Sequence, residues 1–295
     1  MYSNVSLKSK ITSILKLSKF HVIWLLDLAA ITGGLLNVIS FNIIRLFIAI
    51  LCGTFASAGV MIINSGLEIN RDKVMTRTSK RPTVLGIISS KEAIIIGVIM
   101  TLISLTASTI DGFLVTLFIG IGAFVYLIVY TMLLKPRTYW NIVIGGLAGS
   151  AAAWTGFAAE HPSLTLSGLL LGLLIFMWTP GHFWSLALRY KDDYKRANIP
   201  MLPTIVDERT SSLSIFVSNI LMLPIAIYLA YLINTYFLIY TIIISAPLLF
   251  YNIRLLRNPT KEEAWKNFKV SSPYLALYFI GVITFSSLNL LHVFI

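Results

Sequence analysis

Long apolar segments recur along almost the whole chain, and they constrain its fold more than any other feature. Nine of them approach the roughly 20 apolar residues that a helix needs to cross a bilayer. Only 12% of the residues are charged, whereas soluble domains carry about 25%. We therefore expect one all-α, polytopic membrane domain comprising residues 1–295. Its expected spans are 21–40, 43–65, 93–110, 113–133, 140–159, 164–185, 212–233, 236–253 and 273–294.

The positive charges are distributed unequally between the connections. All but one of the 23 Lys and Arg lie before the first span or after spans two, four, six and eight, and the exception is Arg45. Because cytoplasmic loops are enriched in Lys and Arg, we expect a multi-pass protein of the cell membrane with a cytoplasmic N-terminus and an outward-facing C-terminus. This topology accounts for the net charge of +11, so we expect no binding of nucleic acid, which needs a basic face with aromatic residues.

Two smaller observations bound the chemistry. Cys52 is the only cysteine, which excludes an internal disulfide and a cysteine metal cluster. The first 20 residues are basic and amphipathic but lack a small-residue cleavage site, so we expect a mature cytoplasmic end and not a removed signal peptide.

The connection after the second span, NSGLEINRDKVMTRTSKRP, concentrates polar residues. Asn64, Glu68 and Asp72 are spaced by four residues and would share one helical face. Mg²⁺ is usually bound by one or two carboxylates together with substrate phosphates. Three cations suited to phosphate oxygens follow: Arg77, Lys80 and Arg81. The segment therefore predicts a magnesium and diphosphate site, and the alternative is an ordinary loop whose acids offset its cations.

A second polar segment, MWTPGHFWSLALRYKDDYKRANIPMLPT, follows the sixth span. Pro180 and Gly181 would loosen its helix directly before His182. The charged residues that follow include Arg189, Lys191, Asp192 and Asp193. Because both segments are expected on the cytoplasmic side, their side chains can converge on one diphosphate. A lone His at a membrane boundary is also commonly a structural hydrogen-bonding residue.

These two segments together resemble the UbiA superfamily of intramembrane prenyltransferases. The first is similar to the superfamily's N-x-x-x-D-x-x-x-D signature, and its RTSKRP tail resembles the ending found in the branch that farnesylates haem. The run WTPGHFW…YKDDY…IPMLP is the most specific match to that branch. Residues 130–159 also resemble its fourth connection and fifth span.

The chain departs from the family pattern at several positions. Glu68 stands in place of the usual first Asp, which keeps the carboxylate on a longer arm. Asn70 stands where the haem branch often has Asp, and AAAW at 151–154 replaces a stretch that contains Pro. At 19–21, KFH stands where a K-P-R type start is common. The core signature remains.

The resemblance implies nine transmembrane helices around a central cavity. It also implies haem B and a polyprenyl diphosphate as substrates, farnesyl transfer to a haem vinyl group, water addition, and Mg²⁺ as cofactor. The implied metal ligands are Asn64, Glu68, Asp72, Asp192 and Asp193, and the implied diphosphate-binding residues are Arg77, Lys80, Arg81, Arg189 and Lys191. Glu68, Asp72 and His182 would be catalytic, with His182 either a ligand of the haem iron or the base that directs water.

The implied partners are the substrates and the lipid bilayer, with hand-off of the product to a terminal oxidase or a haem A synthase. One alternative is a UbiA-type enzyme that prenylates an aromatic quinone precursor or a lipid glycerol, against which the WTPGHF element argues. A transporter is a second alternative. Transporters place charges or broken helices near the bilayer midplane, whereas most polar clusters here lie at one face.

Overall fold

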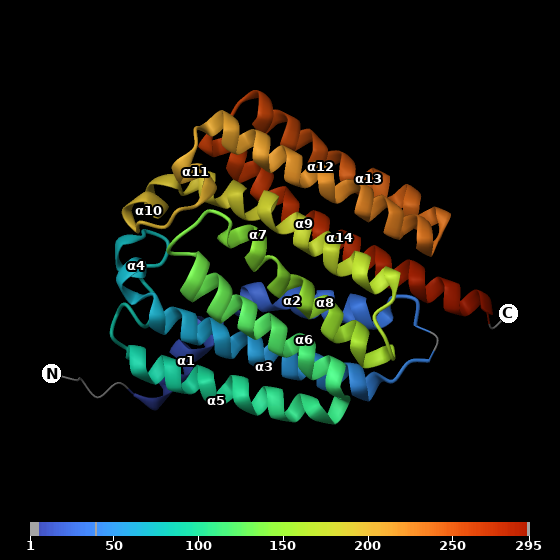
Figure 1. Ribbon diagram of the computed structural model, residues 1–295, viewed down its shortest axis with the longest axis horizontal. Coiled ribbons are helices and arrows are strands. Elements are labelled where there is room, and N and C mark those ends of the chain that lie inside the picture. The colour runs from blue at the N-terminus through green and yellow to red at the C-terminus, as the bar shows by residue number, and fades with distance from the viewer. Residues whose placement is uncertain (1–5, 39, 294–295) are drawn as a thin grey trace.

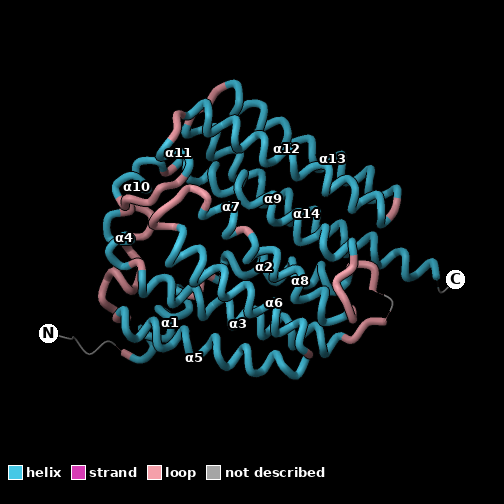
Figure 2. The backbone as a smooth tube through the Cα atoms, in the orientation of Figure 1, coloured by secondary structure: helices cyan, strands magenta, loops and turns pink. Residues whose placement is uncertain are grey.

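The chain forms a bundle of long helices joined by short loops. The computed structural model describes residues 6–38 and 40–293, and this part of the chain contains helices but no strand (Figure 2). The expected all-α membrane fold is therefore confirmed.

Eight helical segments in the described residues are long and apolar enough to cross a membrane. They are α3 (Ile43–Leu67), α5 (Ser90–Ser108) with the 3₁₀ turn η1 (Thr109–Asp111), α6 (Phe113–Phe124) with the π-helix η2 (Val125–Leu134), α7 (Asn141–Gly145) with α8 (Leu147–Glu160), α9 (Leu166–Arg189), α12 (Glu208–Ile233), α13 (Thr235–Arg257) and α14 (Lys261–Val293). The first expected span corresponds to α2 (Phe20–Leu35), which is apolar but shorter.

Four short helices complete the described chain: α1 (Leu7–Leu17), α4 (Ile69–Val74), α10 (Lys191–Arg196) and α11 (Leu202–Ile205). Figure 1 shows α4, α10 and α11 together at one end of the bundle, where α1 also lies, and we call this the α4–α10 end. The last turns of α14 extend from the opposite end (Figure 1). This placement agrees with an odd number of spans.

Long apolar side chains cover the outside of the bundle. On α3 the exposed residues Ile43, Phe47, Leu51 and Phe55 repeat every four positions, which places them on one helical face. Polar Asn64 is only 2% exposed on the same helix. Such an apolar exterior is expected for a helix that faces lipid and directs its polar groups to the bundle interior.

Glycines allow the closest helix pairs to approach. A Cβ on Gly59 of α3 would lie 2.8 Å from the Gly97 carbonyl oxygen of α5, and a Cβ on Gly97 would lie 2.5 Å from the Gly59 carbonyl oxygen. Between α2 and α8, Gly33 lies against the backbone of Ala153 and Gly156 lies against the backbone of Ala30, and neither site has room for a Cβ. Membrane helices associate through such small residues because no hydrophobic effect drives them together in lipid.

The last helix differs from its expected range. It begins at Lys261 and not near 273, so the polar segment before the span is helical. Glu262 and Glu263 occupy its first turn, where acidic side chains favour a helix N-terminus. Glu263 also pairs with Arg254 at 2.7 Å and with Lys266 at 2.8 Å. These local charges extend the helix beyond its apolar segment.

Candidate active site

A cavity of about 820 Å³ opens among the helices. At the α4–α10 end its walls carry Glu68, which joins α3 to α4, and charged residues of α4 and the segment 77–81. Along α3 the lining extends from Asn64 back to Ile50, about 21 Å along the helix axis at 1.5 Å per residue. Beyond the charged end the lining is mainly apolar, including Phe118 and Ile119 of α6. The shape suits a ligand with a charged head and a long apolar tail.

Asn64, Glu68 and Asp72 form the row of one amide and two carboxylates that their spacing predicts, and we call it the acidic row. Glu68 separates α3 from α4, yet its N–H donates to the Asn64 carbonyl at 3.0 Å, and the Asp72 N–H donates to the Glu68 carbonyl at 2.9 Å. These i→i−4 bonds preserve the helical register across the junction. All three side chains line the cavity, and each is less than 5% exposed.

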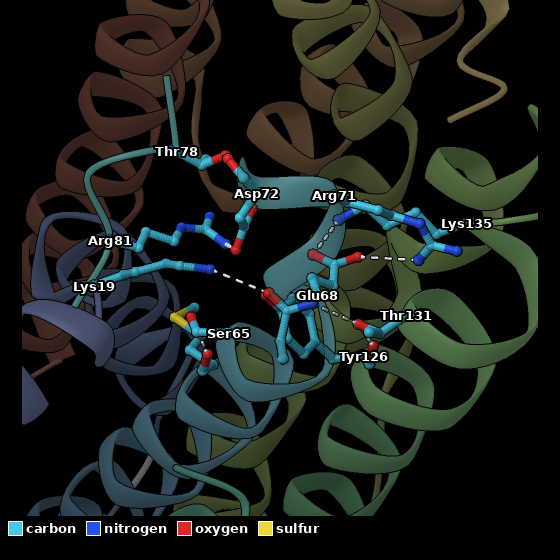
Figure 3. A network of polar contacts seen from close by, with 12 residues as sticks. Lys19, Ser65, Glu68, Arg71, Asp72, Thr78, Arg81, Tyr126, Thr131 and Lys135 are labelled. Carbon is cyan, nitrogen blue, oxygen red and sulfur yellow. Dashed lines mark hydrogen bonds and ion pairs between the residues drawn. The ribbon is translucent and has the colours of Figure 1, made fainter. Parts of the chain in front are cut away.

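Four cations face this row. Lys135 donates to Glu68 at 2.7 Å, and Arg71 lies 3.8 Å from the other Glu68 oxygen. The remaining pairs are Arg81 with Asp72 at 2.5 Å and Lys19 with the Asn64 amide oxygen at 3.3 Å. Figure 3 shows Lys19 and Arg81 approaching the row from one side and Lys135 and Arg71 from the other.

Lys19, Arg71 and Lys135 were absent from the predicted site. Lys19 and Lys135 lie next to the first and fourth spans in the sequence. There they served only to assign the cytoplasmic side of the membrane. Their positions along the sequence could have identified them, because each lies at the end of a span on the side of the membrane where Glu68 is also expected. The backbone of Lys19 adopts a left-handed conformation with φ 53°, which directs the chain from α1 into α2.

The charged row perturbs the ionisation of its members. Burial, together with the nearby cations Arg81 and Lys135, lowers the pKa of Lys19 to about 7. Burial alone would raise the pKa of Glu68, but the charge and hydrogen bond of Lys135 outweigh burial and hold this pKa below its ordinary value. Glu68 is therefore an anion at neutral pH, whereas Lys19 is poised to bind or release a proton.

The π-helix η2 forms the wall opposite Asn64. The Lys135 N–H donates to the Tyr130 carbonyl at 2.8 Å, a bond that spans five residues. Tyr126 and Tyr130 line the cavity, and the hydroxyl of Thr131 accepts from the Asn64 side-chain amide at 3.2 Å. π-helical turns occur frequently at functional sites. Here the π-helix contributes two tyrosines to the cavity lining.

The two polar segments meet, as predicted. The hydroxyl of Thr76 donates to Asp193 at 3.0 Å, and the Arg77 N–H donates to the same carboxylate at 3.4 Å. Arg196 bonds both Thr76 and Asp193. Asp193 is 6% exposed, but it is not among the cavity-lining residues. In this structure it holds the segment after α4 against α10.

The other predicted residues separate into two groups. Arg77, Lys80 and Arg81 line the cavity, whereas Arg189, Lys191 and Asp192 do not. Those three pair instead with residues of other elements. Arg189 lies 3.3 Å from Glu262, Lys191 lies 2.7 Å from Glu208, and Asp192 lies 2.6 Å from Lys261.

His182 lines the cavity beyond the charged row. Its ring is stacked between Trp178 and Phe268, with centroid distances of 4.2 and 4.3 Å, and Phe183 contacts it edge-on. Its Nδ1 lies 2.6 Å from the hydroxyl oxygen of Ser271 on α14. The histidine is therefore held rigidly by three rings and one hydroxyl.

Pro180 lies inside α9 shortly before His182. Pro180 has no N–H to donate, and the next N–H, that of Gly181, donates to the Ser218 hydroxyl of α12 at 3.1 Å. The same hydroxyl donates to the Met177 carbonyl at 2.8 Å. Ser218 thus bridges the two backbone groups of α9 that a regular helix would join directly. The following residue, His182, lies at the cavity wall.

Sequence comparison agrees with this architecture. The sequence profile of the UbiA prenyltransferase family matches residues 26–286. The chain belongs to the UbiA prenyltransferase family. The matched residues include Asn64, Glu68, Asp72 and His182, whereas the cavity-lining Lys19 lies before the matched segment.

Two relatives that align with almost the whole chain carry the same name. A protoheme IX farnesyltransferase of Sulfurisphaera tokodaii is 52% identical over 95% of this chain and 94% of its own length. The protoheme IX farnesyltransferase of Metallosphaera sedula is 51% identical over 94% of this chain and 97% of its own length.

Solved UbiA structures share the fold at low identity. A digeranylgeranylglyceryl phosphate synthase superposes with a TM-score of 0.73 at 19% identity, over 93% of this chain and 99% of its own. A UbiA homologue from Archaeoglobus fulgidus, bound to GPP and Mg²⁺, has a TM-score of 0.68 at 15% identity, over 92% and 99%. These likenesses show the UbiA fold.

The donors of this UbiA cavity fit a magnesium ion that shares its ligands with phosphate. The described residues contain no cluster of three His, Cys, Asp or Glu able to enclose a metal by themselves. Glu68 and Asp72 supply two carboxylates, and Mg²⁺ typically takes one or two carboxylates plus substrate phosphates. One buried oxygen of Glu68 accepts no hydrogen bond, so a ligand position is available.

Proposed function

We propose that this UbiA-family chain transfers the farnesyl group of farnesyl diphosphate to a vinyl group of haem B and adds water, producing haem O. The observation that carries the proposal is one continuous cavity with a row of acids and cations at its mouth, a mainly apolar body and His182 in its wall. The proposal is supported by relatives more than 50% identical that are named protoheme IX farnesyltransferase.

The charged end of the cavity binds the diphosphate. Lys19, Arg81 and Lys135 donate hydrogen bonds to acidic or amide oxygens of the row, and the same groups are suited to phosphate oxygens. Arg77 and Lys80 also line this end. Mg²⁺, bound by Asn64, Glu68 and Asp72, would supply positive charge that stabilises the departing diphosphate. Asp193 supports this end by fixing the segment from Thr76 to Arg77.

The chemistry then takes place in the apolar part. The allylic C–O bond breaks and its electron pair leaves with the diphosphate. The π electrons of the haem vinyl group form the new C–C bond, and water adds to the resulting cationic carbon and loses a proton. Tyr126 and Trp178 line the cavity, where their ring faces can stabilise a cation. The apolar walls exclude bulk water until the C–C bond has formed.

The charged end of the bundle also supports the membrane orientation that we propose. The α4–α10 end carries the connections rich in Lys and Arg, which the positive-inside rule assigns to the cytoplasm. The N-terminus then lies inside the cell membrane and the C-terminus outside, so the diphosphate enters from the cytoplasm. The product passes to a terminal oxidase or a haem A synthase.

The decisive experiment offers the purified protein three acceptors with farnesyl diphosphate and Mg²⁺. Haem B should give a product whose mass equals haem B plus one farnesyl group and one hydroxyl group, because the added water loses a proton. An aromatic acid and a glycerol phosphate lipid should give none. Turnover of either alternative acceptor without turnover of haem B would exclude the proposal and indicate another UbiA activity.

A further inference from the structure

The hydroxyl of Ser271 connects His182 to the backbone of α14. It lies 2.6 Å from Nδ1 of His182, and it donates to the Phe268 carbonyl at 2.9 Å. A serine hydroxyl has one hydrogen but can accept through two lone pairs. With its hydrogen directed to the Phe268 carbonyl, the Ser271 hydroxyl accepts from His182. The geometry therefore assigns the proton of the neutral imidazole to Nδ1.

The other ring nitrogen is left free for a ligand. Nε2 makes no hydrogen bond with any residue in the described part of the chain, while the ring lines the cavity. With Nδ1 protonated, Nε2 carries the lone pair. A cavity-lining nitrogen with an available lone pair can either bind a metal or accept a proton.

The surroundings of the ring favour metal binding. Apart from Ser271, the recorded contacts of the ring are with Trp178, Phe268 and Phe183, and none of these is an anion. A proton accepted at Nε2 would create a buried cation without a partner, which is costly. A neutral imidazole bound to a metal has no such cost. Metal-bound histidines typically donate their second N–H to an acceptor, which is the role that Ser271 fills.

We propose that Ser271 is a positioning residue that holds His182 as the Nδ1–H tautomer, so that Nε2 binds the iron of haem B. This inference rests on the proposed function, in which haem B is the acceptor. It decides between the two roles that the sequence left open for His182. It also gives α14 a part in the reaction, because Ser271 and Phe268 both contact the histidine ring from that helix.

A second hydrogen bond fixes the position of Ser271 relative to α9. The indole N–H of Trp178 donates to the Ser271 carbonyl at 3.0 Å. One turn away, the Asn267 amide donates to the Ser185 hydroxyl at 2.9 Å. Because α9 and α14 are joined on both sides of His182, replacing the Ser271 side chain by Ala leaves the backbone contact in place. The variant Ser271→Ala therefore tests the hydroxyl itself.

The test titrates haem B into the detergent-purified full chain in the absence of any diphosphate. We expect the wild-type protein to give the absorption spectrum of a histidine-bound haem, and His182→Ala to lose it. Ser271→Ala should bind haem about 10- to 100-fold more weakly, the range found when the hydrogen-bond acceptor of a metal-bound histidine is removed. Ser271→Thr, which keeps a hydroxyl, should retain most of the affinity.

Resonance Raman spectroscopy of the ferrous complex distinguishes positioning from a general loss of stability. Only bound haem contributes to the iron–nitrogen stretching band, so its frequency does not depend on how much protein is folded. The frequency should fall in Ser271→Ala, because an imidazole without an acceptor at Nδ1–H is a weaker electron donor. Ser287→Ala is the matched control, since Ser287 also donates to a carbonyl one turn earlier on α14, and it should leave the band unchanged.

The outcomes separate this inference from the proposed function. An unchanged spectrum in His182→Ala, or an unchanged frequency and affinity in Ser271→Ala, would overturn the inference even if the wild-type protein farnesylates haem. If the wild-type protein forms no farnesylated haem under any tested condition, the proposed function fails, and the inference that rests on it fails too.

Discussion

Lys135 donates to Glu68 across 2.7 Å, although the two residues are separated by 67 positions in the sequence. Both side chains are largely buried, with 12% of Lys135 and 4% of Glu68 exposed. The pair joins the C-terminal end of α3 to the end of the π-helix η2. It also places a cation and an anion side by side at the cavity mouth, where a diphosphate and its metal ion need both kinds of charge.

Replacing Lys135 by Met should weaken diphosphate binding. The variant removes a charged donor and leaves the buried Glu68 with a more distant ion-pair partner, Arg71 at 3.8 Å. A hydrogen bond from a charged group contributes about 1.5–3 kcal/mol, so the KM for farnesyl diphosphate should rise about 10- to 100-fold. Lys135→Arg should restore most of the affinity.

Lys261→Met is the control for Lys135→Met. Lys261 also pairs with a carboxylate, that of Asp192, but both side chains are largely exposed. Exposed ion pairs contribute about 0–1 kcal/mol, so this variant should bind farnesyl diphosphate nearly normally. Equal KM values for Lys135→Met and the wild-type protein would remove Lys135 from the site.

Asp72→Asn should reduce kcat/KM by at least about 100-fold, the order of loss seen when one electrostatic stabilising group is removed from an active site. The substitution keeps the shape of the side chain but removes the charge that pairs with Arg81 and that would bind Mg²⁺. Initial rates measured over a range of Mg²⁺ concentrations should show a weaker metal response, and chelation of Mg²⁺ should stop turnover of the wild-type enzyme.

Asp207→Asn provides a matched change outside the cavity. Asp207 caps α12 by accepting from the Thr210 N–H at 2.6 Å, and Asn is an equally good N-cap residue. This control should keep wild-type rates. Wild-type rates in Asp72→Asn as well would show that the acidic row does not bind the catalytic metal.

The pKa of Lys19 makes diphosphate binding depend on pH. This pKa is lowered to about 7, first by burial and then by Arg81 and Lys135, so the ammonium group loses its charge as the pH rises through about 7. An arriving anion favours the charged form and raises the pKa. Diphosphate binding near pH 8 should therefore take up a proton at Lys19, and the KM should increase with pH.

Comparison with Lys19→Arg isolates this effect from the titration of the diphosphate itself. Arginine stays protonated at every pH of interest, so the ratio of wild-type to variant KM should grow between pH 6 and pH 9. Lys8→Arg, at an exposed position of α1, should show the wild-type profile. A constant ratio for Lys19→Arg would mean that Lys19 does not contact the diphosphate.

The apolar spans could be predicted from composition, because their lengths are set by the bilayer. The span expected at 43–65 is α3, Ile43–Leu67, and the span expected at 212–233 is α12, Glu208–Ile233. Hydropathy could not locate the start of α14, since residues 261–272 are polar and become helical through ion pairs such as Glu263 with Lys266. Nor could it show the π-helix η2, because hydropathy does not distinguish π- from α-helical hydrogen bonding.

The site was predictable where it depends on spacing within one segment, as for Asn64, Glu68 and Asp72. It was not predictable where it depends on contacts between segments. Lys19 and Lys135 reach the acidic row only after α2 and η2 pack against α3. Adjacent Asp192 and Asp193 look alike in sequence, but one is exposed and the other is buried against Thr76.

This difference between neighbours gives a further prediction. Asp193→Asn should lower kcat/KM for farnesyl diphosphate about 10-fold or more, because the bonds that fix Thr76 and Arg77 weaken and Arg77 moves at the cavity mouth. Loss of one charged hydrogen bond corresponds to about 1.5–3 kcal/mol. Asp192→Asn breaks only an exposed pair and should stay within about 3-fold. The reverse order would indicate that Asp192 turns inward to bind the metal.

A substitution at Ser218 tests whether its bridge to the Gly181 N–H and the Met177 carbonyl affects haem binding at His182. Ser218→Ala leaves the Gly181 N–H and the Met177 carbonyl without their shared hydroxyl. Each unsatisfied buried group costs about 1–3 kcal/mol, so thermal unfolding in detergent should shift to a lower temperature. Because His182 is the next residue, haem binding should weaken more than diphosphate binding.

Ser214→Ala, one turn earlier on α12, is the control for Ser218→Ala. Its hydroxyl donates only to the Thr210 carbonyl at 2.9 Å and is exposed, so both the unfolding temperature and haem binding should be unchanged. If Ser218→Ala lowers the unfolding temperature but leaves haem affinity intact, the bridge only stabilises the bundle. If it weakens haem and diphosphate binding equally, the effect of Ser218 is global, and the cavity position of His182 is set by α14 through Ser271.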